Sequence, residues 1–350
     1  MNNANSFQAW TENLENRPQI FPHQINLIHD NLLLMELSLD EVRAASFLDQ
    51  RMLSQNSKGS WVPYQLVADI FKNVQETQPA AYIFHVGHCG STLLSRLLEF
   101  ADGARCLREP LALRVLAQDH ADAGDGRSFL TREAREERLQ VLAKMWGRGA
   151  SHTVIKATSI CTDLLELINA SAPETRSVFI YNRAETHSAT LLAGQNALQD
   201  LKGFAQLRLQ RLQQKTGLDI QLNQLSPAQL AALGWLSETS SATRSLEKYP
   251  QHIMLLEFES LLAEPGIALA NVFQHFKIST TEETIENAIR SPVLQTYSKA
   301  PEHKYNAQTR AAILTDSRSR FKREISEALG WLEILADRSE LVAHTLQKFT

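Results

Sequence analysis

Four short apolar segments recur along the middle of the chain, each followed by a stretch with the spacing of an amphipathic helix. The segments are residues 81–86, 153–155, 177–181 and 252–256. Strands that are apolar throughout, rather than at alternate positions, are typical of a parallel sheet buried on both faces. Runs this short also occur in buried helices, because periodicity does not separate the two at this length. Their repeated alternation with helical stretches favours an α/β fold, a three-layer parallel β-sheet flanked by helices.

The regions around these segments predict additions to the core. Residues 1–78 have a helical and loop-rich pattern, and we expect a helical N-terminal extension there. The core domain is then expected to span residues 79–350. A long helical tract at 198–246 is interrupted at Gly217 and Pro227, which predicts a helical insertion between the third and fourth strands.

The first apolar segment runs into a glycine-containing loop and then into a helical stretch. The loop residues are Gly87, His88, Cys89, Gly90, Ser91 and Thr92. In a strand–loop–helix of this kind the backbone N–H groups and the helix dipole favour an anion, and both hydroxyls can bind phosphate oxygens. Ser91 stands where GxxxxGK[ST] loops have their lysine, so a magnesium-dependent kinase or ATPase is less expected. The alternative is that Gly87 and Gly90 merely form a tight turn.

Several segments, in a fixed order, resemble those of one enzyme family. FHVGHCGSTLLSRLL is similar to the 5′-phosphosulfate loop of sulfotransferases that use 3′-phosphoadenosine-5′-phosphosulfate (PAPS). SVFIYNRAETHSATLL resembles their 3′-phosphate strand–loop–helix, and LLEFESLLAEPGIALANVFQHFKI resembles their late signature. With LREPLALR these segments span residues 81–278, and the chain resembles a divergent bacterial-type branch. The resemblance implies a P-loop NTPase-like fold, PAPS as sulfuryl donor, adenosine 3′,5′-bisphosphate (PAP) as product, and no required metal.

The resemblance implies three catalytic residues. Glu109 falls where some branches carry the general base; alternatively it caps a turn or pairs with Arg108 or Arg114. Lys156 resembles a lysine that lies near the transferred group, and its alternative is a solvated lysine at a strand end. His88 takes the place of the basic loop residue of most relatives. Because the ordinary pKa of histidine is about 6.5, His88 supplies a cation only when it is protonated.

Two residues are implied in binding the 3′-phosphate of the donor. Arg183 takes the position of the family's arginine, and a guanidinium suits bidentate binding of phosphate. Its alternative is a surface ion pair with Glu185. The position of the family's serine is Leu191 in this chain, so we expect a nearby hydroxyl, Ser188 or Thr190, to make that contact.

The C-terminal part lacks the glycine-rich cofactor motif of the better-known branch of the family. Residues 298–323 are basic and predicted to be loop-rich, and 324–346 predict a helix pair or one broken helix. We expect basic side chains of this part to close the site instead. These residues are Lys299, Lys304, Arg310, Arg318 and Arg320.

Composition narrows the classes of function. Of 350 residues, 43% are hydrophobic and 21% are charged, which excludes wholesale disorder. The net charge of −4 gives no general attraction to nucleic acid or anionic lipid. The three cysteines form no paired framework and no metal-ligand spacing, which fits a reducing compartment. With neither a signal-peptide pattern nor an apolar stretch long enough to span a bilayer, we expect a cytoplasmic protein without membrane insertion.

The sequence therefore predicts a sulfotransferase that moves a sulfuryl group from PAPS to a hydroxyl or amine. No motif identifies the acceptor, for which we expect a small molecule, a peptide or a glycan, and the oligomeric state stays open. One alternative is a small-molecule or nucleotide kinase with a degenerate loop. The other is a non-catalytic nucleotide-binding protein in which His88 has cost the activity.

Overall fold

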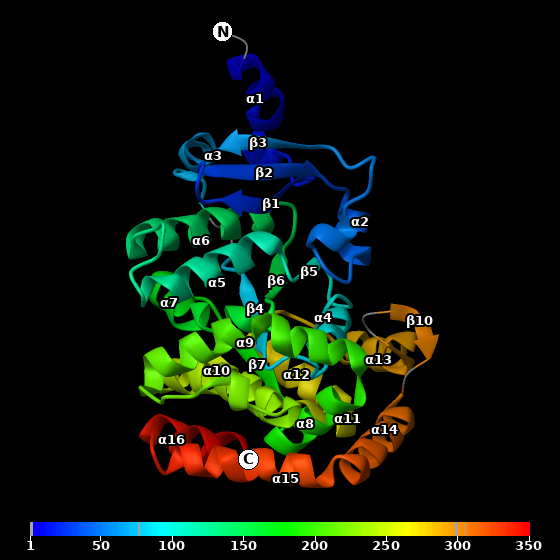
Figure 1. The fold of residues 1–350 in the computed structure, drawn as a ribbon. Coiled ribbons are helices and arrows are strands. Elements are labelled where there is room, and N and C mark those ends of the chain that lie inside the picture. Colours follow the sequence, from blue (N-terminus) through cyan, green and yellow to red (C-terminus); the bar gives the residue numbers. More distant parts are fainter. Residues whose placement is uncertain (1–2, 76–77, 298–299, 305) are drawn as a thin grey trace.

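A five-stranded parallel sheet forms the centre of the molecule (Figure 1). The computed structural model describes residues 3–75, 78–297, 300–304 and 306–350. The strands of this sheet are β4 (Ala81–His85), β5 (Ala104–Arg108), β6 (His152–Lys156), β7 (Ser177–Tyr181) and β8 (Ile253–Glu257). Their order is β5-β6-β4-β7-β8, and every neighbouring pair is parallel. The predicted α/β fold, a parallel sheet between layers of helices, is confirmed.

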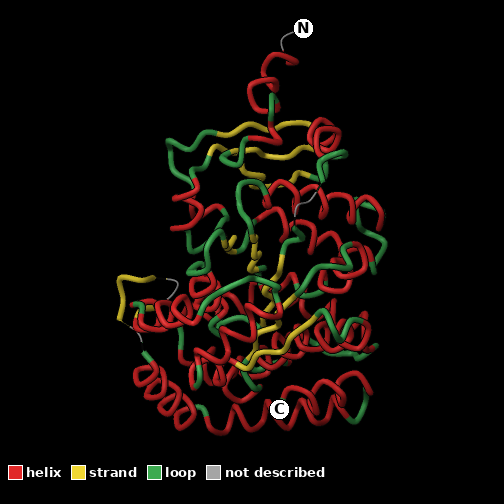
Figure 2. Tube along the Cα trace, turned by 180° about the vertical axis from the view of Figure 1, so that it is seen from behind, coloured by secondary structure: helices red, strands yellow, loops and turns green. Residues whose placement is uncertain are grey.

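Helices cover both faces of this sheet, as the view from behind also shows (Figure 2). The crossover from β4 to β5 and the crossover from β6 to β7 run in opposite directions along the sheet. Right-handed crossovers of opposite direction place their helices on opposite faces. One group of packed helices is α4 (Ser91–Leu98), α12 (Pro265–His275) and α13 (Glu282–Arg290). The other is α7 (Leu164–Ser171), α6 (Arg132–Gly147) and α10 (Pro227–Lys248).

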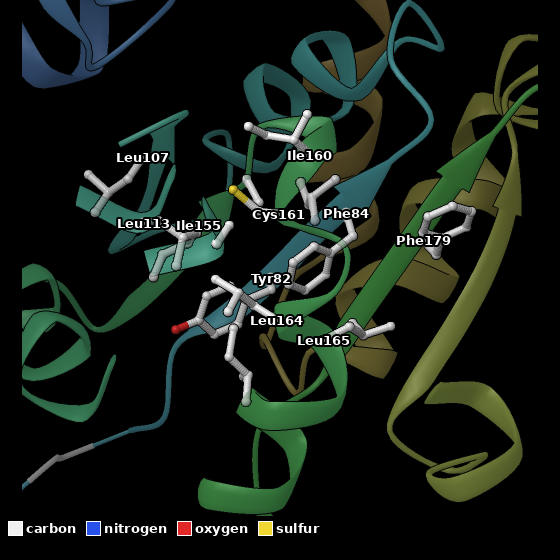
Figure 3. Packing of buried hydrophobic residues seen from close by; sticks show 14 of the residues in the cluster. Tyr82, Phe84, Leu107, Leu113, Ile155, Ile160, Cys161, Leu164, Leu165 and Phe179 are labelled. Atoms are coloured by element: carbon white, nitrogen blue, oxygen red, sulfur yellow. The ribbon is translucent and has the colours of Figure 1, made fainter. Parts of the chain in front are cut away.

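Apolar side chains of the strands form the core beneath these helices. Tyr82 and Phe84 of β4 stack with 5.8 Å between their ring centroids. They belong to the same buried cluster as Leu164 and Leu165 of α7 (Figure 3). Ile83, between them, is also fully buried. Because successive strand side chains alternate between faces, β4 is buried on both faces, as its continuous apolar run predicts.

The strand β5 escapes the sequence pattern because two arginines interrupt its apolar positions. Arg108 is nevertheless fully buried. Its guanidinium donates to Ser95 Oγ at 3.0 Å and to the Arg43 carbonyl oxygen at 2.8 Å, and it forms an ion pair with Glu99. Partners from two segments, α4 with its C-cap and the N-terminal extension, thus satisfy a charge that would otherwise be costly to bury. The missed strand matters because its carboxyl end places Glu109.

The long helical tract between β7 and β8 matches its prediction. It consists of α8 (Ala184–Ala193), α9 (Gln195–Thr216) and α10. The break after α9 falls at Gly217. Pro227 is the first residue of α10, and Ser226 with Gln229 forms a capping box at that end. Proline fits there because the first helical turn has no partner for its N–H.

The N-terminal extension corrects one prediction, because it contains a sheet as well as helices. Its antiparallel strands are β1 (Ile20–Asn26), β2 (Asn31–Glu36) and β3 (Gly59–Pro63), and its helices are α1 (Asn3–Thr11), α2 (Leu39–Ala44) and α3 (Tyr64–Phe71). The apolar run in β2 is too short for periodicity to separate strand from helix. Pairing with neighbouring strands makes this run a strand, since Leu32 lies opposite both Ile25 and Val62. β1 packs on α6 and on α5 (Leu111–Ala123) (Figure 1).

The C-terminal part is more regular than predicted. The strands β9 (Thr296–Tyr297) and β10 (Ala300–Lys304) are followed by the helix α14 (Ala307–Arg320). The prediction that residues 298–323 are loop-rich is therefore wrong for most of that segment. Asn306 caps α14 through a hydrogen bond from the Thr309 N–H, and Leu314 lies in the core. Polar residues dominate its remaining faces and hide this helix from a hydropathy pattern.

The chain continues into α15 (Lys322–Ala336) and α16 (Glu340–Phe349), which is the predicted helix pair. The Phe349 ring packs edge-on against Tyr181 of β7, with 4.8 Å between centroids, and against Trp235 of α10. Across the described ranges, no helix combines the length and apolarity that crossing a membrane requires.

Candidate functional site

The predicted phosphate loop joins the end of β4 to the start of α4. Its backbone is left-handed at three positions, with φ of 86° at Gly87, 51° at His88 and 76° at Gly90. Such turns before a helix N-terminus gather backbone N–H groups into a concave, anion-binding arrangement. Left-handed backbone is strained at His88, which is not a glycine, and strain of this kind gathers at ligand-binding sites.

Gly90 is required by its surroundings as well as by its backbone. A Cβ atom at this position would lie 2.0 Å from Cε2 of Phe258. Phe258 is the first residue of α11 (Phe258–Ala263), directly after β8, and its side chain is buried. The segment that resembles the family's late signature therefore packs its ring on the glycine of the loop.

Two side chains of this region stabilise the loop rather than face a ligand. The Gly87 N–H donates to His85 Nδ1 at 2.9 Å, so Nε2 carries the proton and donates to the Ala157 carbonyl oxygen at 2.9 Å. His85 is thus a neutral imidazole that joins the loop to the segment after β6. The Cys89 thiol is fully buried and donates to the Ile180 carbonyl oxygen at 3.2 Å. Cys89 serves as a small loop residue.

The hydroxyls at the start of α4 fit an anion in the loop. Ser91 and Thr92 are both buried in the first turn of the helix. Thr92 Oγ1 has no hydrogen-bond partner among the described residues. A buried hydroxyl without a partner is costly, and an oxygen of a bound phosphate would satisfy it. Asn182, after β7, supports the loop by donating from Nδ2 to the His88 carbonyl oxygen at 3.3 Å.

Glu109 and Lys156 meet at the carboxyl edge of the sheet, where ligands of open α/β sheets bind. The Glu109 N–H donates to the Lys156 carbonyl oxygen at 2.7 Å, and Lys156 Nζ donates to Glu109 Oε1. Lys156 is 0% exposed and Glu109 is 9% exposed. Glu109 also has a left-handed backbone, with φ of 56°. The alternative of a solvated Lys156 is therefore wrong, and Glu109 pairs with Lys156 rather than with Arg108 or Arg114.

Arg51, from the N-terminal extension, is a site residue that the sequence did not indicate. Its guanidinium lies 3.8 Å from Glu109 Oε2, forms an ion pair of 2.7 Å with Asp49, and stacks 3.3 Å from the Phe47 ring centroid. The Leu48 N–H donates to the Arg108 carbonyl oxygen at 2.7 Å. The extension thus forms a wall of the site beside the candidate base.

Arg183 lies at the end of β7 and precedes the first residue of α8. Its side chain is 60% exposed and pairs with Glu257 at the end of β8, with 2.9 Å between Nε and Oε1. The hydrogen bonds and charge of Glu257 raise the pKa of Arg183. The predicted alternative partner, Glu185, instead pairs with Arg318 at 3.1 Å.

The two hydroxyls considered beside Arg183 differ in what they contact. Thr190 donates to the Thr186 carbonyl oxygen at 2.7 Å, within α8. Ser188 is fully buried, and its Oγ has no hydrogen-bond partner among the described residues. Ser188 is therefore the better candidate for a contact that the donor would complete.

Of the five basic residues expected to close the site, Arg310 approaches the loop. It is buried, pairs with Glu259 at 2.7 Å and lies 4.9 Å from the ring centroid of Phe258. Arg320 instead stacks on Phe321 at 5.1 Å. Lys299 lies outside the described residues, and so does the side chain of Lys304. The segment 257–259 thus holds Arg183 and Arg310 through its two glutamates while its central ring covers the loop.

His187, on α8, is a buried member of the same region. Burial, which is the largest cause, together with the neighbouring His88 and Arg208 lowers its pKa to about 3. His187 is therefore neutral and cannot supply a cation at neutral pH. Among the described residues, no group of three His, Cys, Asp or Glu side chains is placed to hold a metal ion.

The chain is similar to several solved structures, at low sequence identity. No protein-family model and no curated protein matches the chain. The sulfotransferase domain from the curacin biosynthetic pathway is 11% identical, with 71% of this chain and 99% of that chain covered and a TM-score of 0.41. A sulfotransferase from Alicyclobacillus acidocaldarius is 12% identical, with 75% and 98% covered and a TM-score of 0.41. A mouse sulfotransferase complexed with PAP is 9% identical, with 81% and 93% covered and a TM-score of 0.42.

These three structures are sulfotransferases. At such low identity the likeness concerns the fold alone, and the strand order and the loop described above carry the fold assignment by themselves.

Proposed function

We propose that this protein is a sulfotransferase that transfers a sulfuryl group from PAPS to a hydroxyl or amine of its acceptor. The observation that carries the proposal is the buried Lys156–Glu109 pair beside a phosphate loop without the Walker lysine. The pair places a carboxylate and a fixed cation at the sheet edge where the loop ends. The transfer of a sulfuryl group needs these two functions, a base and a cation.

In this proposal the loop binds the phosphosulfate group of PAPS. The backbone N–H groups of residues 88–91 supply hydrogen bonds, together with the hydroxyls of Ser91 and Thr92. The Gly87 N–H is not among them, because it donates to His85. Arg183 and Ser188 bind the 3′-phosphate. Arg310, on its Phe258 support, adds a further cation close to the loop.

The chemical step then has a clear role for each side chain. The acceptor oxygen or nitrogen forms a bond to sulfur while the bond from sulfur to the bridging oxygen breaks. The bonding electrons stay on that oxygen, which becomes a terminal oxygen of the 5′-phosphate of PAP. Glu109 takes the proton that the acceptor loses, and Lys156 stabilises the negative charge that develops. A positioned base of this kind contributes about 10²–10⁴-fold in rate.

Ligand-induced thermal stabilisation tests the choice of donor. PAP at about 100 times its Kd should stabilise the folded protein by about 2.7 kcal/mol. ATP with magnesium is the comparison, because a kinase would respond to it. Stabilisation by ATP with magnesium, and none by PAP, would overturn the proposal. Thr92→Val is a matched variant that should weaken the response to PAP, since the buried hydroxyl then offers no hydrogen bond.

Slow release of sulfate from PAPS, with water as acceptor, tests the chemistry without knowledge of the acceptor. Glu109→Gln should bind PAP and yet release sulfate at least about 100-fold more slowly than the native protein. A native protein that binds PAP tightly but hydrolyses PAPS no faster than buffer, with any acceptor tried, would identify a binding protein rather than an enzyme.

A further inference from the structure

The guanidinium of Arg51 is held firmly at the wall of the site. Its Cζ lies 3.3 Å from the centroid of the Phe47 ring. Its Nε donates to Asp49 Oδ1 at 2.9 Å, and its NH2 group donates to Asp49 Oδ2 at 2.7 Å. Asp49 is only 4% exposed, and it also accepts from the Arg51 backbone N–H at 3.0 Å. Side chains of the N-terminal extension therefore fix one face and one edge of the guanidinium.

Backbone hydrogen bonds fix this part of the extension relative to the candidate base. The Leu48 N–H donates to the Arg108 carbonyl oxygen at 2.7 Å, and the Leu111 N–H donates to the Leu48 carbonyl oxygen at 3.2 Å. These two contacts lie on either side of Glu109 in the sequence. Arg51 thus has a defined place beside Glu109, with 3.8 Å between its NH2 group and Oε2.

The other edge of the guanidinium, formed by NH1 and NH2, remains open. A guanidinium carries five N–H donors, and Asp49 occupies the side of Nε and NH2. Within the described part of the chain NH1 donates no hydrogen bond, and the distance from NH2 to Glu109 is too long for one. Because the side chain of Arg51 is 56% exposed, this edge can meet a molecule that enters the site from solvent.

The carboxylate of Glu109 also has one engaged oxygen and one open oxygen. Oε1 accepts from Lys156 Nζ, whereas Oε2 accepts no hydrogen bond from the described residues. In the proposed reaction Oε2 is therefore the atom that takes the proton of the acceptor. An acceptor atom within hydrogen-bond distance of Oε2 lies no more than about 7 Å from NH2 of Arg51. A neighbouring group of the same acceptor can thus reach the open edge of the guanidinium.

A second arginine adds positive charge to this part of the site. Arg114 lies near the start of α5 and follows Glu109 closely in the sequence. It forms no hydrogen bond and no ion pair with any residue that the structure describes. Burial opposes the ionisation of Asp49, but the hydrogen bonds and charge of Arg51 and the charge of Arg114 hold the pKa of this carboxyl below its usual value. Asp49 thus interacts with two guanidinium groups.

We propose that Arg51, assisted by Arg114, recognises a carboxylate of the acceptor, so that the acceptor is an acid whose carboxylate lies within a few bonds of its reacting hydroxyl or amine. This inference rests on the proposed function. The parallel N–H groups of NH1 and NH2 match the two oxygens of a carboxylate. The pairing of Glu109 with Lys156 limits the repulsion between the base and such an acceptor. Arg51 would then select the substrate that Glu109 deprotonates.

Pairs of hydroxy acids and their primary amides test this role without knowledge of the natural acceptor. The acids are glycolate, 3-hydroxybutyrate and 4-hydroxyphenylacetate, and each amide keeps the hydroxyl but lacks the negative charge. A compound that enters the site changes the rate of PAP release from PAPS, upward if it accepts the sulfuryl group and downward if it excludes water. The concentration that gives half of this effect should be about ten-fold to a hundred-fold lower for an acid than for its amide, the range of a hydrogen bond to a charged group.

Variants of the two arginines show whether they cause this difference. Arg51→Met should bring the half-effect concentrations of each acid and its amide together, mainly by weakening the acid. Arg51→Lys keeps a charge without the paired N–H groups and should keep part of the difference, and Arg114→Met should lose a smaller part of it than Arg51→Met. Arg132→Met is the matched control, because Arg132 is 61% exposed and pairs with Glu136 on its own helix at 2.8 Å. It should leave the difference unchanged.

The outcomes separate this inference from the proposed function. If the native protein releases PAP from PAPS but acids act no better than amides, or no acid changes this release, the inference is overturned and the proposed function stands. An equal loss for acid and amide in Arg51→Met also overturns it, because Arg51 then only supports the wall or Glu109. If Arg51→Met does not fold, a full acid preference in both Arg51→Lys and Arg114→Met overturns it instead. If the native protein neither binds PAP nor releases it from PAPS, the proposed function fails and this inference fails with it.

Discussion

Two ion pairs at the same edge of the sheet differ in their exposure to solvent. Lys156 and Glu109 are buried beside the phosphate loop, and Arg51 lies on the far side of the carboxylate. Arg183 and Glu257 form their pair at the surface, where the arginine is 60% exposed. The first pair lies where the transferred group is expected, and the second where the distal phosphate is expected.

The difference teaches which end of the site is fixed in advance. A buried pair is hard to separate, because either partner alone would be an uncompensated charge in the interior. A surface pair exchanges readily with water and with other anions. In the proposed reaction, the end that would perform the chemistry is therefore arranged before the donor arrives, whereas the end that would recognise the donor can exchange a carboxylate for a phosphate.

The largest effect is expected when one partner of the buried pair is removed. Lys156→Met should lower the free energy of unfolding by about 3–5 kcal/mol, because Glu109 is left buried without its partner. Urea denaturation measures the loss. Arg183→Met should leave the urea midpoint nearly unchanged. The double variant Lys156→Met, Glu109→Leu should recover much of the lost stability. Equal losses of stability in Lys156→Met and Arg183→Met would contradict the difference between the buried pair and the surface pair.

Acid should lower the stability of the folded protein through the buried side chain of His187. Burial holds its pKa at about 3 in the folded state, against an ordinary value of about 6.5 when unfolded. The unfolded state therefore takes up a proton first as the pH falls, so stability is complete above about pH 6.5 and is lost towards pH 3. One such group contributes a slope of about 1.4 kcal/mol per pH unit in that window.

His187→Gln supplies the comparison for this acid effect. Between pH 4 and pH 7 the free energy of unfolding should depend less on pH in the variant than in the native protein. The difference in slope should correspond to about one proton taken up on unfolding. Parallel curves for the native protein and the variant would show that the pKa of His187 is the same in the folded and unfolded states.

Removing the exposed arginine should affect binding and leave the fold intact. Arg183→Ala is expected to weaken PAP about ten-fold, through the loss of a charge-assisted contact with the 3′-phosphate. Adenosine 5′-phosphate should bind the variant and the native protein alike. Calorimetric titration of both ligands measures this, and an equal loss for both would place Arg183 away from the 3′-phosphate.

The smallest effect is expected from the partner of Arg183. Glu257→Gln removes the carboxylate that competes with the 3′-phosphate, so PAP should bind about two-fold to five-fold more tightly, the range of a surface ion pair. Glu185→Gln is the matched control, because Glu185 pairs with Arg318. A loss of affinity in Glu257→Gln would mean that Glu257 orients Arg183 for binding rather than competing for it.

The sequence predicted the parts of the fold that depend on local patterns. The strands β4, β6, β7 and β8 are apolar on both faces, and the loop after β4 has its glycines where left-handed backbone occurs. Arg183 could be placed because it directly follows one of these strands.

The parts that were missed depend on contacts between distant segments. β5 was not predicted because its Arg108 is neutralised by Glu99 and by carbonyl oxygens of the extension. Arg51 reaches Glu109 only through the docking of residues 47–52 on β5, and Arg208 reaches Ser159 from the middle of α9. A hydropathy pattern carries no information about such pairings. The sequence prediction therefore did not include Arg51 as a neighbour of the candidate base.

The imidazole of His85 links the phosphate loop to the segment that follows Lys156, through one hydrogen bond at each nitrogen. A donor that moves the Gly87 N–H must change the electronic environment of Nδ1. The ¹⁵N chemical shifts of this single ring would therefore form a spectroscopic reporter of loop occupancy. Such a reporter needs neither turnover nor an acceptor, so a library of candidate acceptors could be screened for those that alter the ring signal only when PAP is present.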